Sequence, residues 1–165
     1  MSPTCYPIQA ERTMDPITEL DTLSDPDYLA AFAAGSLPPR LWTHYAHIRM
    51  AWLVLSELPF PLAVQRIRSG ILNYNTVALG RPEAYHESIT LCYAHLIAGA
   101  LRPDQPWPDF VTANPDLFSN SKAYLGRFYS QDRLFSDEAR QGFVLPDLAP
   151  LPRQAALEAY LATGP

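Results

Sequence analysis

The chain has 165 residues and a formal net charge of −5, with 48 % hydrophobic and 18 % charged residues. This length suits one domain of ordinary size, and the hydrophobic share favours a buried core over a disordered chain. The acidic balance, with Lys122 as the only lysine, argues against binding to nucleic acid or to an anionic membrane surface, because both require a basic face on the protein.

Cysteine content and hydropathy indicate the cellular compartment of the protein. Cys5 and Cys92 provide neither a disulfide framework nor a CxxC metal pair. The first residues lack the basic and apolar regions of a secretory signal, and polar residues interrupt every apolar run before it reaches the length of a membrane span. We therefore expect a cytoplasmic protein without membrane association. The sequence is compatible with a homo-oligomer.

The chain contains seventeen prolines, most of them in clusters. Proline is tolerated in the first turn of a helix and breaks a helix interior, so prolines should mark where helices start. Residues 1–23 show no hydrophobic periodicity and are predicted to form a loose N-terminal arm, which leaves a single helical domain over residues 24–165. Within it, a short first helix should begin near Asp25 and end at Gly35.

Three long helices are expected next, each opening with a proline. They are predicted over residues 39–58, 61–79 and 82–101. Shorter helices should follow over residues 107–113, 119–128, 131–135, 137–141 and 154–161. The proline-rich stretch 143–153 should be extended. Since no segment alternates as a strand does, the sequence predicts an all-α fold of three long helices, several short ones and a proline-rich C-terminal strap.

The first long helix carries two of the four histidines. At about 100° per residue, His44, His47 and Ala51 lie on one stripe that is otherwise apolar and should face the core. A histidine pair at i and i+3 can bind one metal ion. The alternative is two buried imidazoles held by hydrogen bonds. Thr43 precedes the pair and is a candidate hydrogen-bond partner that orients a ring.

A third histidine, His86, opens the segment 82–101. It shares a helical face with Ile89, Thr90, Tyr93 and Ile97. Three histidines with an open fourth position are typical of catalytic zinc and related divalent ions. We therefore predict that His44, His47 and His86 converge on one divalent ion, with Thr90 bonded to the His86 ring. The ligand set does not distinguish zinc, iron, nickel or manganese. His95, about 180° from His86 around the helix, should lie outside the site.

Two further residues are candidates for catalysis. Glu87 follows His86, and Tyr74 lies on the predicted helix over 61–79. Each has a structural alternative: Glu87 as a first-turn carboxylate that complements the helix dipole, and Tyr74 as a core aromatic with its hydroxyl at the rim.

Three segments together resemble a known family. Trp42 to Ile48 (WTHYAHI), Tyr85 to Thr90 (YHESIT) and Leu134 to Arg140 (LFSDEAR) look like the signature of a family of small bacterial proteins of uncharacterised function. The resemblance spans roughly residues 30–150 and includes Pro146-Asp147-Leu148. It implies that the histidine segments and the tail segment occur as one unit, and it implies no particular activity.

Two functions remain open at this stage. The first is a divalent-metal protein, a metal-dependent enzyme acting on a small molecule, with the ion as Lewis acid or source of hydroxide. The second is a metal-free small-molecule binding or scaffold protein in which the histidines are structurally buried and aromatic residues line an apolar pocket. Both hypotheses include a small-molecule ligand.

Overall fold

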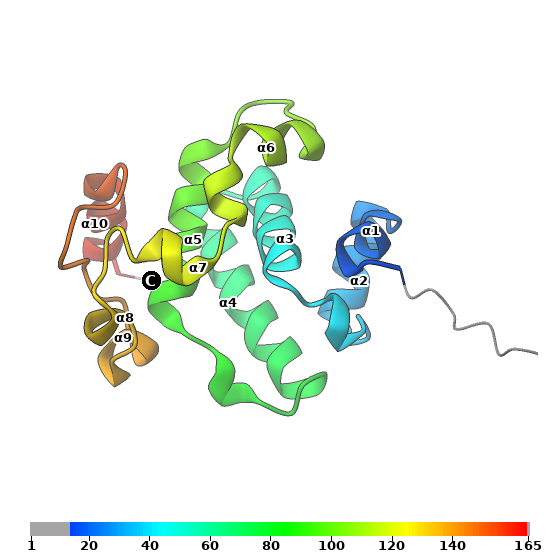
Figure 1. Ribbon diagram of the computed structural model, residues 1–165, viewed down its shortest axis with the longest axis horizontal. Helices are drawn as coiled ribbons and strands as arrows, with labels where there is room; N and C mark the ends of the chain where they lie inside the picture. The colour runs from blue at the N-terminus through cyan, green and yellow to red at the C-terminus, as the bar shows by residue number, and fades with distance from the viewer. Residues whose placement is uncertain (1–13, 165) are drawn as a thin grey trace, which may run out of the picture.

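The fold is built entirely from helices. The computed structural model describes residues 14–164, and over that range it contains ten α-helices, three 3-10 turns and no strand (Figure 1). The prediction of an all-α fold is confirmed. None of the helices formed by these residues is long and apolar enough to cross a membrane.

Three long helices lie at the centre of the molecule (Figure 1). They are α3 (His44–Glu57), α4 (Phe60–Val77) and α5 (Glu87–Ala100), and each packs against the other two. Their mutual faces hold much of the buried apolar surface, for example Ile48, Ile67 and Leu91. Burial of such side chains is the main favourable contribution to folding, so these helices form the frame on which any site is positioned.

The first predicted long helix is shorter than expected at its N-terminal end. Residues 39–41 form the 3-10 turn η1 (Pro39–Leu41), and the chain then leaves helical geometry before α3 begins at His44. Thr43 is extended, and its hydroxyl accepts the Ala46 backbone N–H at 3.4 Å. A threonine at this position satisfies an otherwise unpaired N–H of the first turn, so the helix starts at the first histidine of the pair.

The third predicted long helix is interrupted in the same way. The turn η2 (Pro82–Ala84) is followed by extended backbone at Tyr85 and His86, and α5 begins at Glu87. The prediction placed His86 within a continuous helix. It is instead the N-cap residue of α5, with φ −141° and ψ 109°, and this changes where its ring lies.

A short helix lies within the segment expected to be a loose arm. This helix, α1 (Pro16–Asp21), is capped by Asp15 and buries Leu20 completely. The buried guanidinium of Arg49 donates to the Leu20 carbonyl at 2.9 Å and thereby ties α1 to α3. The rest of the expected arm, residues 1–13, lies outside the described residues.

The next helix, α2 (Asp25–Ala33), matches its predicted limits. Ser24 caps it, and the chain reverses at Gly35, where φ is +68°. A Cβ atom at Gly35 would stand 2.8 Å from Cγ1 of Val77. Glycine is therefore required here both by the left-handed backbone and by the close approach of the end of α4.

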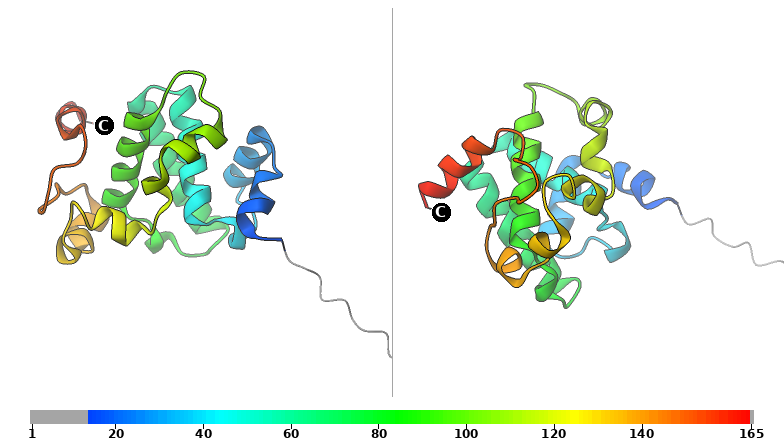
Figure 2. Two further views of the ribbon diagram at one scale, coloured as in Figure 1. Left: turned by 45° about the horizontal axis from the view of Figure 1, so that its top comes forward. Right: turned by 60° about the vertical axis from the view of Figure 1, so that its left-hand side comes forward.

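The remaining helices cover the central three. They are α6 (Trp107–Ala113), the turn η3 (Pro115–Phe118), α7 (Ser121–Leu125), α8 (Gln131–Leu134), α9 (Asp137–Gln141) and α10 (Gln154–Ala162). Helices α1 and α2 lie on one side of the central group, and α8, α9 and α10 lie on the opposite side, as Figures 1 and 2 show.

The segment between α9 and α10 is the predicted strap. Residues 143–153 form neither helix nor strand, with bends at 147–149 and a turn at 152–153, and they lie beside α5. Near one end of the strap the Val144 N–H donates to Oγ of Ser88 at 3.1 Å, and near the other end Nε2 of His95 donates to the Pro152 carbonyl at 2.7 Å. The strap therefore closes one side of the helical core.

Candidate functional site

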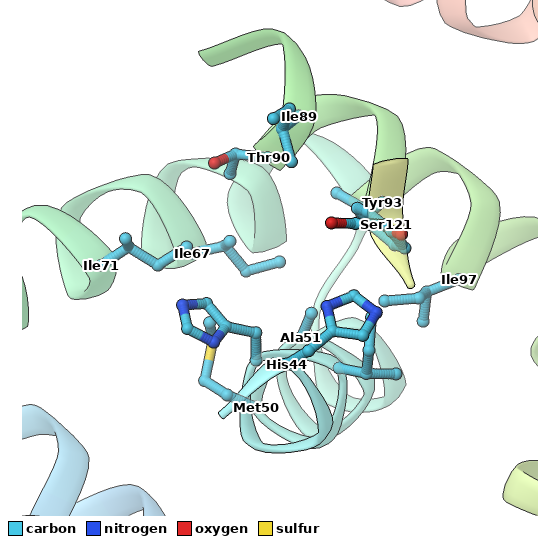
Figure 3. A pocket seen from close by; sticks show the side chains of 13 residues that line it. His44, Met50, Ala51, Ile67, Ile71, Ile89, Thr90, Tyr93, Ile97 and Ser121 are labelled. Atoms are coloured by element: carbon cyan, nitrogen blue, oxygen red, sulfur yellow. The ribbon is translucent and has the colours of Figure 1, made fainter. Parts of the chain in front are cut away.

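A cavity of about 270 Å³ lies between α3, α4 and α5, with α7 at one end. Figure 3 shows the labelled side chains, among them His44, Ile71 and Thr90, arranged around this open space. Both histidines of the α3 pair line it. The cavity is thus the place where the histidine stripe meets the other two long helices.

The walls follow from helix periodicity. The lining residues recur at three- and four-residue intervals, so that each long helix presents one stripe to the cavity. From α3 come His44, His47, Ile48, Met50 and Ala51; from α4, Ile67 and Ile71; from α5, Ile89, Thr90, Tyr93, Ala94 and Ile97; and from α7, Ser121. The wall is therefore mainly branched aliphatic, with a small number of polar groups.

The His47 ring is held on two sides. Its Nδ1 donates to the Thr43 carbonyl at 2.7 Å, and the imidazole packs on the Trp42 indole with ring centroids 3.7 Å apart. Burial lowers the pKa of His47 to about 4, because the charged form would lose its hydration. Thr43 therefore does orient a ring, through its backbone carbonyl, while its hydroxyl caps α3.

The His44 ring is anchored to a distant part of the chain. Its Nε2 donates to the carbonyl of Leu117 in η3 at 2.8 Å, and the Tyr93 ring lies against it edge-on at 5.1 Å. Burial lowers the pKa of His44 as well. Both imidazoles on the cavity are consequently neutral at pH 7.

Three residues that carry a hydroxyl group line the cavity: Thr90, Tyr93 and Ser121. The Tyr93 hydroxyl is fully buried and has no hydrogen-bond partner within residues 14–164. A buried hydroxyl without a partner costs about 1–3 kcal/mol. Among residues 14–164, no side chain that lines the cavity carries a charge at pH 7, so the cavity offers hydrogen bonds in apolar surroundings.

His86 lies apart from this cavity. Nδ1 of His86 accepts the Ile89 backbone N–H at 3.3 Å, and Nε2 donates to the Leu134 carbonyl at 2.9 Å. Both ring nitrogens are thus engaged in capping α5 and in fastening α8 to it. The expected convergence of three histidines is not formed, because His86 stands before the helix rather than on its inner face.

The expected partner of His86 also has a different position. Thr90 does not bond to the His86 ring, whose two nitrogens are already occupied, and it lines the cavity instead. His95 lies outside the cavity, as the helical wheel places it, and bonds to the strap.

The two candidates for catalysis do not line the cavity either. The Tyr74 hydroxyl is buried and donates to the Leu37 carbonyl at 2.7 Å. Glu87 stands in the first turn of α5, forms an ion pair with Arg68 and accepts the Tyr85 hydroxyl at 2.5 Å. In both cases the side chain is occupied by contacts that support the fold.

Comparison of the chain with protein-family models, curated proteins and solved structures finds no match. The resemblance to a small bacterial family therefore stays a prediction. Over residues 14–164, no group of three or more histidine, cysteine, aspartate or glutamate side chains is placed to hold a metal ion. Metal binding and a metal-dependent activity also stay predictions, and elemental analysis of the purified protein tests them.

Sequence reasoning did not foresee that α7 contributes to the cavity. Ser121 reaches it from α7, and the sequence separates Ser121 from the histidine pair by more than seventy residues. No periodic signal connects such distant segments. The unpartnered state of the Tyr93 hydroxyl was likewise invisible, since it depends on what surrounds the ring in three dimensions.

Proposed function

We propose that this protein binds a small, neutral and largely apolar molecule in the cavity between α3, α4 and α5. The observation that carries the proposal is the cavity itself: about 270 Å³ of space with aliphatic walls, two neutral imidazoles and no charged side chain from residues 14–164. Ligand sites have this composition, mostly apolar with a few polar groups that fix orientation.

The size of the cavity limits the ligand. The volume of about 270 Å³ lies just below the range of about 300–1,000 Å³ that is usual for ligand pockets, and such a volume suits a single small ring with one substituent. Burying an apolar molecule of this size contributes about 25 cal/mol for each Å² removed from water. The small volume and the apolar walls of the cavity together favour monocyclic or branched aliphatic compounds over nucleotides, sugars or lipids with long chains.

Toluene is a suitable first probe, because it is neutral, apolar and of the right size. A ligand that binds only the folded state stabilises it by RT ln(1 + [L]/Kd), about 2.7 kcal/mol at a concentration of one hundred times Kd. We expect toluene to raise the melting temperature of the protein in a concentration-dependent way, and calorimetry of the full chain measures it.

A cavity-filling variant locates the effect. Ala51 lies on the cavity wall, so Ala51→Leu should occupy part of the space and abolish the rise in melting temperature. Ala123 is an exposed alanine of α7, and Ala123→Leu serves as the matched control that keeps the rise. If toluene has no effect on the wild type, or the same effect in Ala51→Leu, the proposal fails.

A further inference from the structure

The hydrogen bonds of the two cavity histidines determine which ring nitrogens carry hydrogen. A backbone carbonyl only accepts, so Nδ1 of His47 must donate to Thr43, and Nε2 of His44 must donate to Leu117. A neutral imidazole has one N–H and one lone pair. The remaining nitrogens, Nε2 of His47 and Nδ1 of His44, are therefore acceptors.

The His47 acceptor is the better placed of the two. Nε2 lies at the end of the ring opposite its attachment to Cβ, and Trp42 covers one face of the ring. Within residues 14–164, this nitrogen has no hydrogen-bond partner, whereas Nδ1 of the same ring is bonded. His47 lines the cavity, so a molecule in the cavity meets a lone pair whose direction is held by Thr43 and Trp42.

The alternatives for this lone pair are limited. Over the described residues, no Lys or Arg side chain lines the cavity, and the buried hydroxyl of Tyr93 makes no hydrogen bond to this nitrogen. A buried acceptor that faces an apolar ligand loses its hydration without compensation. A ligand that donates a hydrogen bond avoids this loss.

We infer that the cavity selects a small neutral ligand that donates a hydrogen bond, a phenol or a similar hydroxyl compound, to Nε2 of His47. This rests on the proposed function and adds the polar group of the ligand. The apolar part of the ligand lies against the isoleucines of α4 and α5, and the hydrogen of its hydroxyl group points to Nε2 of His47.

Phenol and toluene test the inference, because they share size and shape and differ in the hydroxyl group. A net hydrogen bond in such a site corresponds to roughly a tenfold difference in affinity. We expect phenol to bind the full chain at pH 7.5 about tenfold more tightly than toluene. Titration calorimetry gives both dissociation constants.

Substitution of His47 assigns the preference to that ring. His47→Phe keeps an aromatic ring against Trp42 and removes the acceptor, so the two probes should then bind with equal affinity. His95→Gln is the matched control, because His95 bonds to the strap and does not line the cavity. In that variant the tenfold preference should be retained.

A measurement on the wild type keeps the inference testable if His47→Phe does not fold. In protein labelled with ¹⁵N at histidine, the signal of Nε2 of His47 should move toward the position of a hydrogen-bonded nitrogen when phenol binds, and should stay in place with toluene.

The outcomes separate this inference from the proposed function. Equal binding of both probes to the wild type overturns the donor requirement while the binding function stands. A preference that survives in His47→Phe, or a Nε2 signal that phenol does not move, overturns the assignment to His47. Absence of toluene binding, with or without binding of phenol, overturns the proposed function and this inference with it.

Discussion

The partly buried imidazole of His47 makes the stability of this protein depend on pH. The pKa of the ring falls from 6.5 to about 4, because burial disfavours the charged form. In the unfolded chain the ring takes up a proton near pH 6.5, whereas in the folded protein it resists protonation until about pH 4. Between these values the unfolded state binds more protons, so stability decreases as the pH falls.

The size of the loss follows from the shift. One pKa unit corresponds to about 1.4 kcal/mol, so His47 contributes a loss of about 3 kcal/mol by pH 4. The full stability is present above about pH 6.5, and the loss levels off below about pH 4, where both states carry the proton. Against a typical stability of roughly 5–15 kcal/mol for a small domain, this is a large effect for one side chain.

His47→Phe isolates this contribution. The phenyl ring keeps the packing on Trp42 but loses the bond to the Thr43 carbonyl, which still accepts the backbone N–H of residue 47. The variant should therefore be about 1 kcal/mol less stable than the wild type at pH 7.5. Near pH 6 the two proteins should be equally stable, and at pH 4 the variant should be the more stable one.

Urea unfolding followed by circular dichroism, at pH steps from 7.5 to 4, measures both stabilities. The pKa values of His44 and His86 are also lowered by burial, but both rings are present in the two proteins and their contributions cancel in the difference. Parallel stability curves that do not cross would refute the reasoning, because they would show that His47 titrates alike in the folded and unfolded chains.

Three further predictions concern the frame around the cavity. His86→Ala removes the cap of α5 and the bond to α8, and it should lower the free energy of unfolding in urea by about 2–3 kcal/mol. His86→Asn keeps a capping side chain and should recover about 1 kcal/mol of this loss. Equal losses in both variants would contradict the capping role. Gly35→Ala should cost about 1 kcal/mol more than Gly80→Ala in thermal unfolding, because both have positive φ but only the first places a Cβ at 2.8 Å from Val77. Burial raises the pKa of Cys92 to about 12, so iodoacetamide at pH 8 should label this thiol only after unfolding. Labelling of Cys92 in the native protein, distinguished from labelling of Cys5 by mass spectrometry of the peptides, would contradict its burial.

Local sequence signals predicted the helices and much of the cavity wall. Proline at helix starts and serine or threonine at caps are recognised within a few residues, and α6 and α9 have the predicted limits. The stripe of His44, His47 and Ala51 does face the interior and lines the cavity. Helical periodicity depends only on neighbouring residues, so the sequence was sufficient for these statements.

The capping role of His86 could not be predicted from local sequence signals. Histidine is not among the residues that usually cap helices, and nothing near it in the sequence indicates a break in the helix. Its ring is held by the Leu134 carbonyl, 48 residues further along the chain. Whether the residue lay on the inner face of a helix or in front of it was decided by that distant contact.

The sequence alone determined that the protein is all-α, where most of its helices begin and which faces turn inward, because turn residues and periodicity act over one or two helical turns. The tertiary structure decided which histidines share a cavity, which ring nitrogens are already bonded and that no charged side chain in the described part of the chain lines the cavity. These properties depend on carbonyls and side chains that are distant in sequence, such as Leu117 and Leu134, and packing alone brings them to the rings.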